Sequence, residues 1–213
     1  MTLADIRWDV ILGGFGLFMF GIEFMGSSLK EFAGPKLKEY IDKFTSNPFS
    51  AFLIGVVITV IMQSSSASTA ITIGMVRAGL MSLEQAAGIV FGANIGTTIT
   101  SFLISLDLGQ YILYVIFAGA IVSCFSGNKK TKCLGNIFLG FGLVFYGLNS
   151  MGDALSVLKE IPAFTMVAEK LSNNALLSLL AGTVMTGLCQ ASAATIGVVQ
   201  KMYEAGALSF TAV

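Results

Sequence analysis

Residues 57–74 read VITVIMQSSSASTAITIG, and they place four polar residues in succession, Gln63, Ser64, Ser65 and Ser66, inside an apolar run. The apolar segment before them, residues 50–62, would reach only about 20 Å as a helix, which is too short for the roughly 30 Å hydrocarbon core of a bilayer. A second apolar arm follows over residues 67–80. The pattern therefore predicts two short helices separated by a polar break.

Composition places these arms in a membrane protein. Of the 213 residues, 55% are hydrophobic and only 11% are charged, and the mean hydropathy is +0.84. This balance is typical of a polytopic α-helical protein in a lipid bilayer. Because the net charge is zero and histidine is absent, nothing suggests a nucleic-acid partner, and the commonest general base and transition-metal ligand is excluded. The three cysteines lack the paired spacing of a metal or redox motif.

Several further segments surround the break. Four are long and apolar enough to be predicted as membrane-spanning helices: residues 10–29, 86–106, 110–126 and 134–151. Residues 30–45 are charged and predict an amphipathic segment at the membrane interface. A basic loop is expected at residues 129–132, and a second short apolar arm over 175–189 ends at Gln190.

The chain contains an internal repeat. GFGLFMFGIEFMGSSL (14–29) and GFGLVFYGLNSMGDAL (140–155) are identical at eight of sixteen positions. One residue of slippage later, five residues of the first break align with five of a second: Gly55, Thr59, Gln63, Ser65 and Ala67 with Gly182, Thr186, Gln190, Ser192 and Ala194. We therefore expect a first repeat over residues 1–133 and a second, incomplete repeat over 134–213.

The basic segments predict how the repeats lie in the membrane. Cytoplasmic loops collect Lys and Arg. If residues 50–80 crossed once, the basic segments at 30–43 and 129–132 would fall on opposite sides. If these residues instead enter and return as a re-entrant hairpin, both basic segments share one face. The sequence thus favours an all-α fold of two inverted repeats, each with a spanning helix and a re-entrant hairpin, which is the plan of secondary transporters.

A helix that restarts inside the membrane can bind ions. Its N-terminus presents free N–H groups and a partial charge of about +0.5, which attract an anion without any basic side chain. Hydroxyls of Ser64, Ser65 and Ser66 and the amide of Gln63 would add donors. The free carbonyl and hydroxyl oxygens suit Na⁺. The alternative is that these serines only hold helices together, as small polar residues do in bilayers.

Three motifs, QSSSAS (63–68), QASAAT (190–195) and FGANIGTTIT (91–100), resemble the type II sodium–phosphate cotransporter family. The resemblance implies sodium-coupled transport of inorganic phosphate, bound between the two hairpin tips, in a multi-pass protein of the cell (inner) membrane. The substrate contacts that it implies are Gln63, Ser64, Ser65, Ser66, Asn94, Thr97, Thr98, Gln190 and Ser192. The sodium contacts are Ser66, Ser68, Thr69, Asn94 and Thr195.

Two features depart from the family pattern. Ala191 and Ala193 stand where hydroxyls are expected in the second motif, so an asymmetric site is expected. By the repeat offset, a second Asn-Gly-Thr-Thr element would begin near residue 220. We therefore expect either that the chain is truncated or that a second chain, such as the partner in a homodimer, completes the unit. The resemblance also implies that the full-length chain continues to a PhoU-like domain, as bacterial members of the family often do.

One further residue and several other classes of protein are considered as candidates. Glu23 lies in the first apolar helix, where an acid can help to bind a cation or can reach the interface. An enzyme is not expected, because Ser65 as a nucleophile would need a base and the chain has no histidine. The alternatives that remain are a transporter of another small anion, such as a dicarboxylate or sulfate, and a channel or structural membrane subunit.

Overall fold

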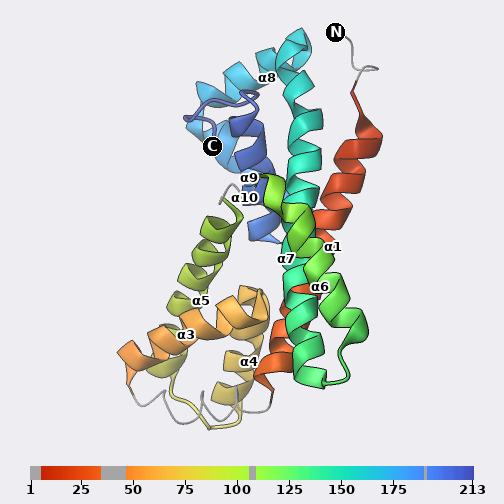
Figure 1. Ribbon diagram of the computed structural model, residues 1–213. Helices are drawn as coiled ribbons and strands as arrows, with labels where there is room; N and C mark the ends of the chain where they lie inside the picture. Colours follow the sequence, from red (N-terminus) through yellow and green to blue (C-terminus); the bar gives the residue numbers. More distant parts are fainter. Residues whose placement is uncertain (1–5, 35–46, 106–108, 190) are drawn as a thin grey trace. The chain divides into compact units, whose positions relative to one another are not determined.

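The computed structural model describes residues 6–34, 47–105, 109–189 and 191–213, and all regular elements in these ranges are helical (Figure 1). The predicted all-α class is confirmed for this part of the chain. The α-helices are α1 (Trp8–Ala33), α3 (Pro48–Met62), α4 (Ser65–Arg77), α5 (Leu83–Ile104), α6 (Ile112–Phe125), α7 (Lys129–Leu155), α8 (Pro162–Ser172), α9 (Ala175–Cys189) and α10 (Ser192–Glu204). Two 3₁₀-helices, Gly109–Tyr111 and Ser156–Glu160, precede α6 and α8.

Three helical stretches of the described chain are long and apolar enough to cross a membrane: Trp8–Ala33, Leu83–Leu103 and Lys129–Glu160. The pair α8–α9, bent by 115°, would be a fourth if it counts as one broken span. The stretch that corresponds to the span predicted over residues 110–126, Gly109–Phe125, is apolar but shorter than these and is not among the candidate spans. Most of the predicted interfacial segment, residues 35–45, lies outside the described residues.

The helices form two compact units. One, called here the first-hairpin unit, comprises Ile22–Leu106 and Tyr114–Phe141. The other, the second-hairpin unit, comprises Met1–Gly21, Asp107–Leu113 and Gly142–Val213. Each unit thus contains one of the two short-helix pairs that the sequence predicts, and each is described separately below.

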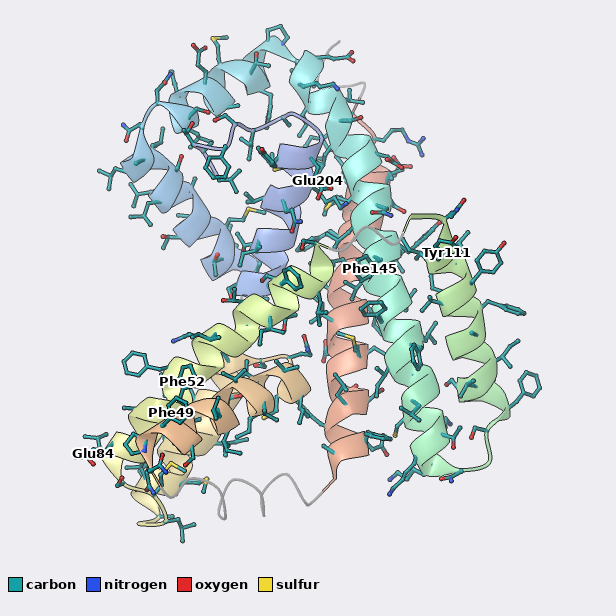
Figure 2. The ribbon with its side chains drawn as sticks, turned by 60° about the vertical axis from the view of Figure 1, so that its left-hand side comes forward. Phe49, Phe52, Glu84, Tyr111, Phe145 and Glu204 are labelled. Atoms are coloured by element: carbon teal, nitrogen blue, oxygen red, sulfur yellow. The ribbon has the colours of Figure 1, made fainter. Side chains whose placement is uncertain are left out.

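In the first-hairpin unit, α3 begins where the sequence places Asn47-Pro48. Asn47 is the N-cap, its side chain accepts a hydrogen bond from the Ser50 amide at 2.8 Å, and the Ser50 hydroxyl closes a capping box. Pro48 occupies the first helical position, where its missing N–H costs nothing. Phe49 and Phe52 stack with ring centroids 6.4 Å apart, and Figure 2 labels both on the first turns of α3.

Glycines bring α3 and α5 into backbone contact. A Cβ atom on Gly88, Gly92 or Gly96 of α5 would lie 2.5, 2.0 or 2.8 Å from a carbonyl oxygen of α3. Across the seam, a Cβ on Gly55 would lie 2.2 Å from the Ile89 oxygen. This four-residue spacing of glycines is the small-residue packing that membrane helices use when hydrophobic burial cannot drive them together. The seam fixes α3 against a long, apolar helix.

The same unit holds the ends of α1 and α7 together. Lys129 Nζ lies 2.9 Å from Glu31 Oε1, which joins the last turn of α1 to the first turn of α7. Residues 129–132 are helical rather than a loop as predicted. The Asn128 side chain accepts from the Lys130 amide at 3.1 Å and so caps the helix before the lysines, a local signal that the prediction overlooked.

In the second-hairpin unit, α1 and α7 pack in opposite directions. A Cβ on Gly14 would meet the Gly147 oxygen at 2.7 Å and the Met151 nitrogen at 3.0 Å, whereas a Cβ on Gly147 would meet the Phe18 nitrogen at 2.6 Å. Residues later in α1 therefore contact residues earlier in α7, which means that the two helices are antiparallel here. Helix α10 joins them through Gly197, whose Cβ would meet Phe18 and Leu148 side chains.

Candidate functional site

The first predicted break is present at Gln63. Helix α3 ends at Met62, and Gln63 adopts the left-handed conformation with φ 51° and ψ 25°. Among the described residues it is the one non-glycine with a positive φ, a conformation that costs about 1–2 kcal/mol for an L-residue. The Gln63 amide still donates to the Thr59 carbonyl at 2.8 Å. The break is thus a fixed turn that the surrounding structure holds in place.

A new helix starts directly after this turn. Ser64 is extended, with φ −153° and ψ 106°, and its hydroxyl accepts from the Ala67 amide at 3.2 Å. Ser64 is therefore the N-cap of α4, a position that serine favours. Ser65 and Ser66 form the first turn of α4; Ser65 is half-buried and Ser66 is exposed.

The two arms fold back on each other. The Thr59 hydroxyl donates to the Ser68 hydroxyl at 3.0 Å, and both side chains are buried. In a straight helix these residues, nine apart, would be separated by about 13 Å along the axis. The Ser68 hydroxyl in turn donates to the Ser64 carbonyl at 3.0 Å. The predicted break is therefore a sharp turn at Gln63 and Ser64. The pair α3–α4 is called here the first hairpin, with these two residues as its tip, and its re-entrant course in a membrane stays a prediction.

The amide of Gln63 is only half satisfied. Its Nε2 donates to the Val60 carbonyl at 2.6 Å, whereas Oε1 is buried and has no hydrogen-bond partner among the described residues. A buried acceptor without a partner is costly and points to a missing donor or cation. The sequence predicted that this amide donates to an anion, but in the structure Nε2 bonds to Val60 and the oxygen is the atom without a partner.

Helix α1 approaches the hairpin tip through Gly26. A Cβ there would lie 3.1 Å from Gln63 Cβ and 3.4 Å from the Met62 oxygen. Gly26 was not predicted to contact the break, although it is one of the identical positions of the internal repeat, where it aligns with Gly152. Glu23 lies three residues earlier on α1, roughly on the same face, and its side chain is exposed.

The α5 motif supports the hairpin through its glycine. A Cβ on Gly96 would lie 2.8 Å from Thr59 Cβ. The polar members stay within their own helix: the Thr97 hydroxyl donates to Ala93 and the Thr98 hydroxyl to Asn94. The Asn94 and Thr98 side chains are exposed and that of Thr97 is half-buried. Their predicted role as substrate contacts remains a prediction.

The second break repeats this local geometry. Gln190 lies outside the described residues, but Ala191 has φ −148° and ψ 109°, close to the values of Ser64. The Thr186 hydroxyl donates to the Thr195 hydroxyl at 3.0 Å, the counterpart of the pair Thr59–Ser68. Ser192 begins α10 and is exposed. The two breaks thus share the backbone angles of the N-cap residue and a hydroxyl–hydroxyl bond across the break.

The C-terminal ends of α4 and α10 also have the same backbone conformation and hydrogen bond. Gly79 after α4 and Gly206 after α10 both have φ 71°. The amide of the residue that follows each glycine donates to a carbonyl five residues back, Leu80 to Met75 at 3.0 Å and Ala207 to Met202 at 2.8 Å. Glycine is required at this position because it adopts a positive φ without steric cost.

The surroundings of the two hairpins differ. Gly55 of α3 abuts α5, whereas a Cβ on its counterpart Gly182 of α9 would meet no described atom within 4 Å. Beside α9 lies a largely apolar cavity of about 1080 Å³, lined by α8, α9, α10 and the last residues of the chain. The first hairpin is therefore braced by a neighbouring helix on a face that is open in the second.

Comparisons with known proteins agree with these motifs. The chain is 29% identical over 194 residues to "Uncharacterized protein YqeW" of Bacillus subtilis, which covers 91% of this chain and 63% of that protein. It is 25% identical to "Putative inorganic phosphate export protein YjbB" of Escherichia coli, over 94% of this chain and 37% of that protein. It is 33% identical to the mouse "Sodium-dependent phosphate transport protein 2A", over 83% of this chain and 30% of that protein.

The chain thus spans between 30% and 63% of the length of these relatives. No solved structure matches it. The family model described as Na⁺/Pi-cotransporter matches residues 17–153, a stretch that includes the first hairpin and the α5 motif. The match covers more than half of the sequence and agrees with the resemblance of its three motifs, so the chain belongs to the Na⁺/Pi-cotransporter family.

Proposed function

We propose that this chain binds inorganic phosphate together with Na⁺ at its helix breaks, as part of a transporter that couples the movement of the two ions across the cell membrane. The observation that carries the proposal is the tip of the first hairpin. There, a helix N-terminus and a buried, unpartnered carbonyl oxygen lie on adjacent residues, Ser64 and Gln63. One group favours an anion and the other a cation.

The hydrogen bonds at the tip suggest how the two ions divide its groups. Phosphate would be held by the free amides at the start of α4 and by the hydroxyls of Ser65 and Ser66. Sodium would take oxygen ligands, of which Gln63 Oε1 is the one that the hairpin leaves without a donor. Ser66, Thr69 and Asn94 remain candidates for further sodium contacts, and Thr97 and Thr98 for phosphate contacts.

The second hairpin is proposed to supply the counterpart contacts. The N-cap residue of α10, Ala191, has nearly the same backbone angles as Ser64, and the first turn of α10 carries the exposed hydroxyl of Ser192. Gln190 stands in the repeat position of Gln63. A role for both hairpins in one transport cycle rests on this repetition and on the family.

Two contacts support inverted repeats with re-entrant hairpins. In one unit, α1 and α7 pack antiparallel at Gly14 and Gly147. In the other, Glu31 and Lys129 join the end of α1 to the start of α7. These ends lie on one side of a membrane only if the chain between them crosses it an even number of times. With α5 and α6 as two crossings, the hairpin α3–α4 returns to the side from which it entered.

Equilibrium binding tests the proposal most directly. The purified protein is mixed with radiolabelled phosphate in sodium chloride and, separately, in choline chloride of equal ionic strength. Saturable binding that requires sodium is expected, with little competition from sulfate. Uptake into proteoliposomes with and without an inward sodium gradient then tests coupled transport. Phosphate binding that is absent, or equal in the two salts, would contradict sodium-coupled phosphate recognition.

A further inference from the structure

In each hairpin a pair of hydroxyls forms a hydrogen bond between the two arms. One member of each pair, Ser68 or Thr195, is a sodium contact according to the family resemblance. In the first hairpin the Thr59 hydroxyl donates to Ser68 at 3.0 Å, and the Ser68 hydroxyl donates to the Ser64 carbonyl at 3.0 Å. The exposed fractions of Thr59 and Ser68 are 1% and 2%. Both hydroxyl protons are therefore committed within the hairpin, away from any surface that an ion could reach.

The hydroxyl of Thr59 does not bond to the partner that is usual for a threonine in an apolar helix. Threonines in apolar helices usually donate to the carbonyl four residues earlier, as Thr72 does to Ser68 and Thr100 does to Gly96. Thr59 instead donates across the break to the other arm. Its own carbonyl accepts the amide of Gln63 at 2.8 Å, so Thr59 contacts both the turn and the opposite arm.

The same pair recurs in the second hairpin. The Thr186 hydroxyl donates to Thr195 at 3.0 Å, and the Thr195 hydroxyl lies 3.4 Å from the Ala191 carbonyl. Each of these residues stands 127 positions after its counterpart in the first hairpin. The acceptor has changed from serine to threonine, yet the bond between the arms has the same length. Both copies of the repeated sequence thus form the same hydrogen bond across the break.

We infer that these pairs, named here the hydroxyl clamps, are positioning elements that hold the two arms of each hairpin together and fix the turn at its tip. Ser68 and Thr195 are then clamp residues rather than the sodium contacts that the family resemblance implied. Through Thr59, the clamp sets the left-handed turn of Gln63 and the direction of its free oxygen. The part of this inference that concerns ion binding rests on the proposed function, and the part that concerns the hairpin does not.

Hydrogen–deuterium exchange of the whole protein in lipid nanodiscs tests the clamp without any ligand. The variants are Thr59→Val, which removes the donor at nearly constant volume, and Ser68→Ala. Amides of residues 63–68 are expected to exchange about fivefold faster in Thr59→Val, the loss of one net hydrogen bond. Thr59→Ser should restore the rate. Because the partners act as a pair, the double variant should exchange little faster than Ser68→Ala alone.

Matched controls separate the clamp from general damage. Thr100→Val removes a buried hydroxyl that bonds only within its own helix, and it should leave exchange at residues 63–68 unchanged. In α9, Thr186→Val is compared with Thr183→Val, whose hydroxyl bonds to Leu179 of the same helix. Since Thr186 is less buried than Thr59, this second pair of variants serves if Thr59→Val does not fold.

Phosphate binding gives a second readout. Thr59→Val should raise the apparent Kd for phosphate by about three- to tenfold, through misplacement of the tip, with the number of sites unchanged and with recovery in Thr59→Ser. Exchange at residues 63–68 that is unaffected by Thr59→Val and Ser68→Ala, or effects that simply add, would overturn the clamp. A wild-type protein that binds no phosphate would overturn the proposed function, and the exchange data would still decide the clamp.

Discussion

At the scale of single residues, the hairpin tip combines a conformation that glutamine disfavours with an oxygen that lacks a donor. Strained turns of this kind persist when the surrounding structure holds them, and they cluster at functional positions. The polar run predicted the position of this turn, because four polar residues interrupt an apolar helix. It did not predict which atom of Gln63 stays free, since that depends on a hydrogen bond to Val60.

The strain at Gln63 predicts a trade between stability and function. Gln63→Gly should be more stable than Gln63→Ala by about 1 kcal/mol, because glycine adopts φ 51° without the penalty of a Cβ. Both variants lose the free amide oxygen and should lose the sodium dependence of phosphate binding. Thermal unfolding in detergent, followed by the two-salt binding assay, measures both effects. Equal stability of the two variants would argue against a left-handed residue at this position.

Ser65 tests the anion side of the tip. Ser65→Ala removes one hydroxyl from the first turn of α4 and should weaken phosphate binding by about 1 kcal/mol, roughly a fivefold rise in Kd, with little change in expression. Ser27→Ala is the control, because the Ser27 hydroxyl is exposed and bonds only to Phe24 in its own helix. Identical phosphate affinity in Ser65→Ala and wild type would remove Ser65 from the site.

At the scale of elements, the sequence predicted best what depends on local pattern. The second apolar arm was predicted over residues 175–189, and helix α9 has these bounds. The prediction from sequence was wrong where a single side chain outside the hydrophobic pattern decides where a helix begins. Asn128 caps α7 and draws the lysines at 129–132 into the helix. Contacts made in three dimensions, such as Gly26 against Gln63, leave no signal in the spacing of one chain.

The seam between α3 and α5 should be sensitive to one added methyl group. Gly92→Ala would place a Cβ 2.0 Å from the Phe52 oxygen, so the helices must separate, at an expected cost of about 1–3 kcal/mol. Gly74→Ala is the control: a Cβ there meets no described atom within 4 Å, and alanine should stabilise the helix by about 0.5–1 kcal/mol. Shifts of the melting temperature in opposite directions are expected. A Gly92→Ala protein as stable as wild type would exclude close packing at the seam.

At the scale of the whole molecule, the proposed topology predicts which residues share a side of the membrane. In a variant without native cysteines, single cysteines at the exposed positions of Ala78, Gly127 and Ser105 are labelled with a membrane-impermeant maleimide from each side. Positions 78 and 127 should react from one side and position 105 from the other, since the hairpin returns whereas α5 crosses. Reaction at 78 and 127 from opposite sides would show that α3 and α4 together cross the membrane once.

The N-cap residue differs between the two breaks, and this difference has a consequence for the hydrogen bonds that each helix start can make. Ser64 uses its hydroxyl oxygen on the amide of Ala67, whereas alanine at 191 has no oxygen to offer the equivalent amide of Ala194. The start of α10 therefore has one backbone N–H without the side-chain cap that the equivalent N–H of α4 receives. If this helix start binds an anion as proposed, alanine at position 191 need not weaken the site, because the amide that lacks a side-chain cap keeps its capacity to donate a hydrogen bond to the anion.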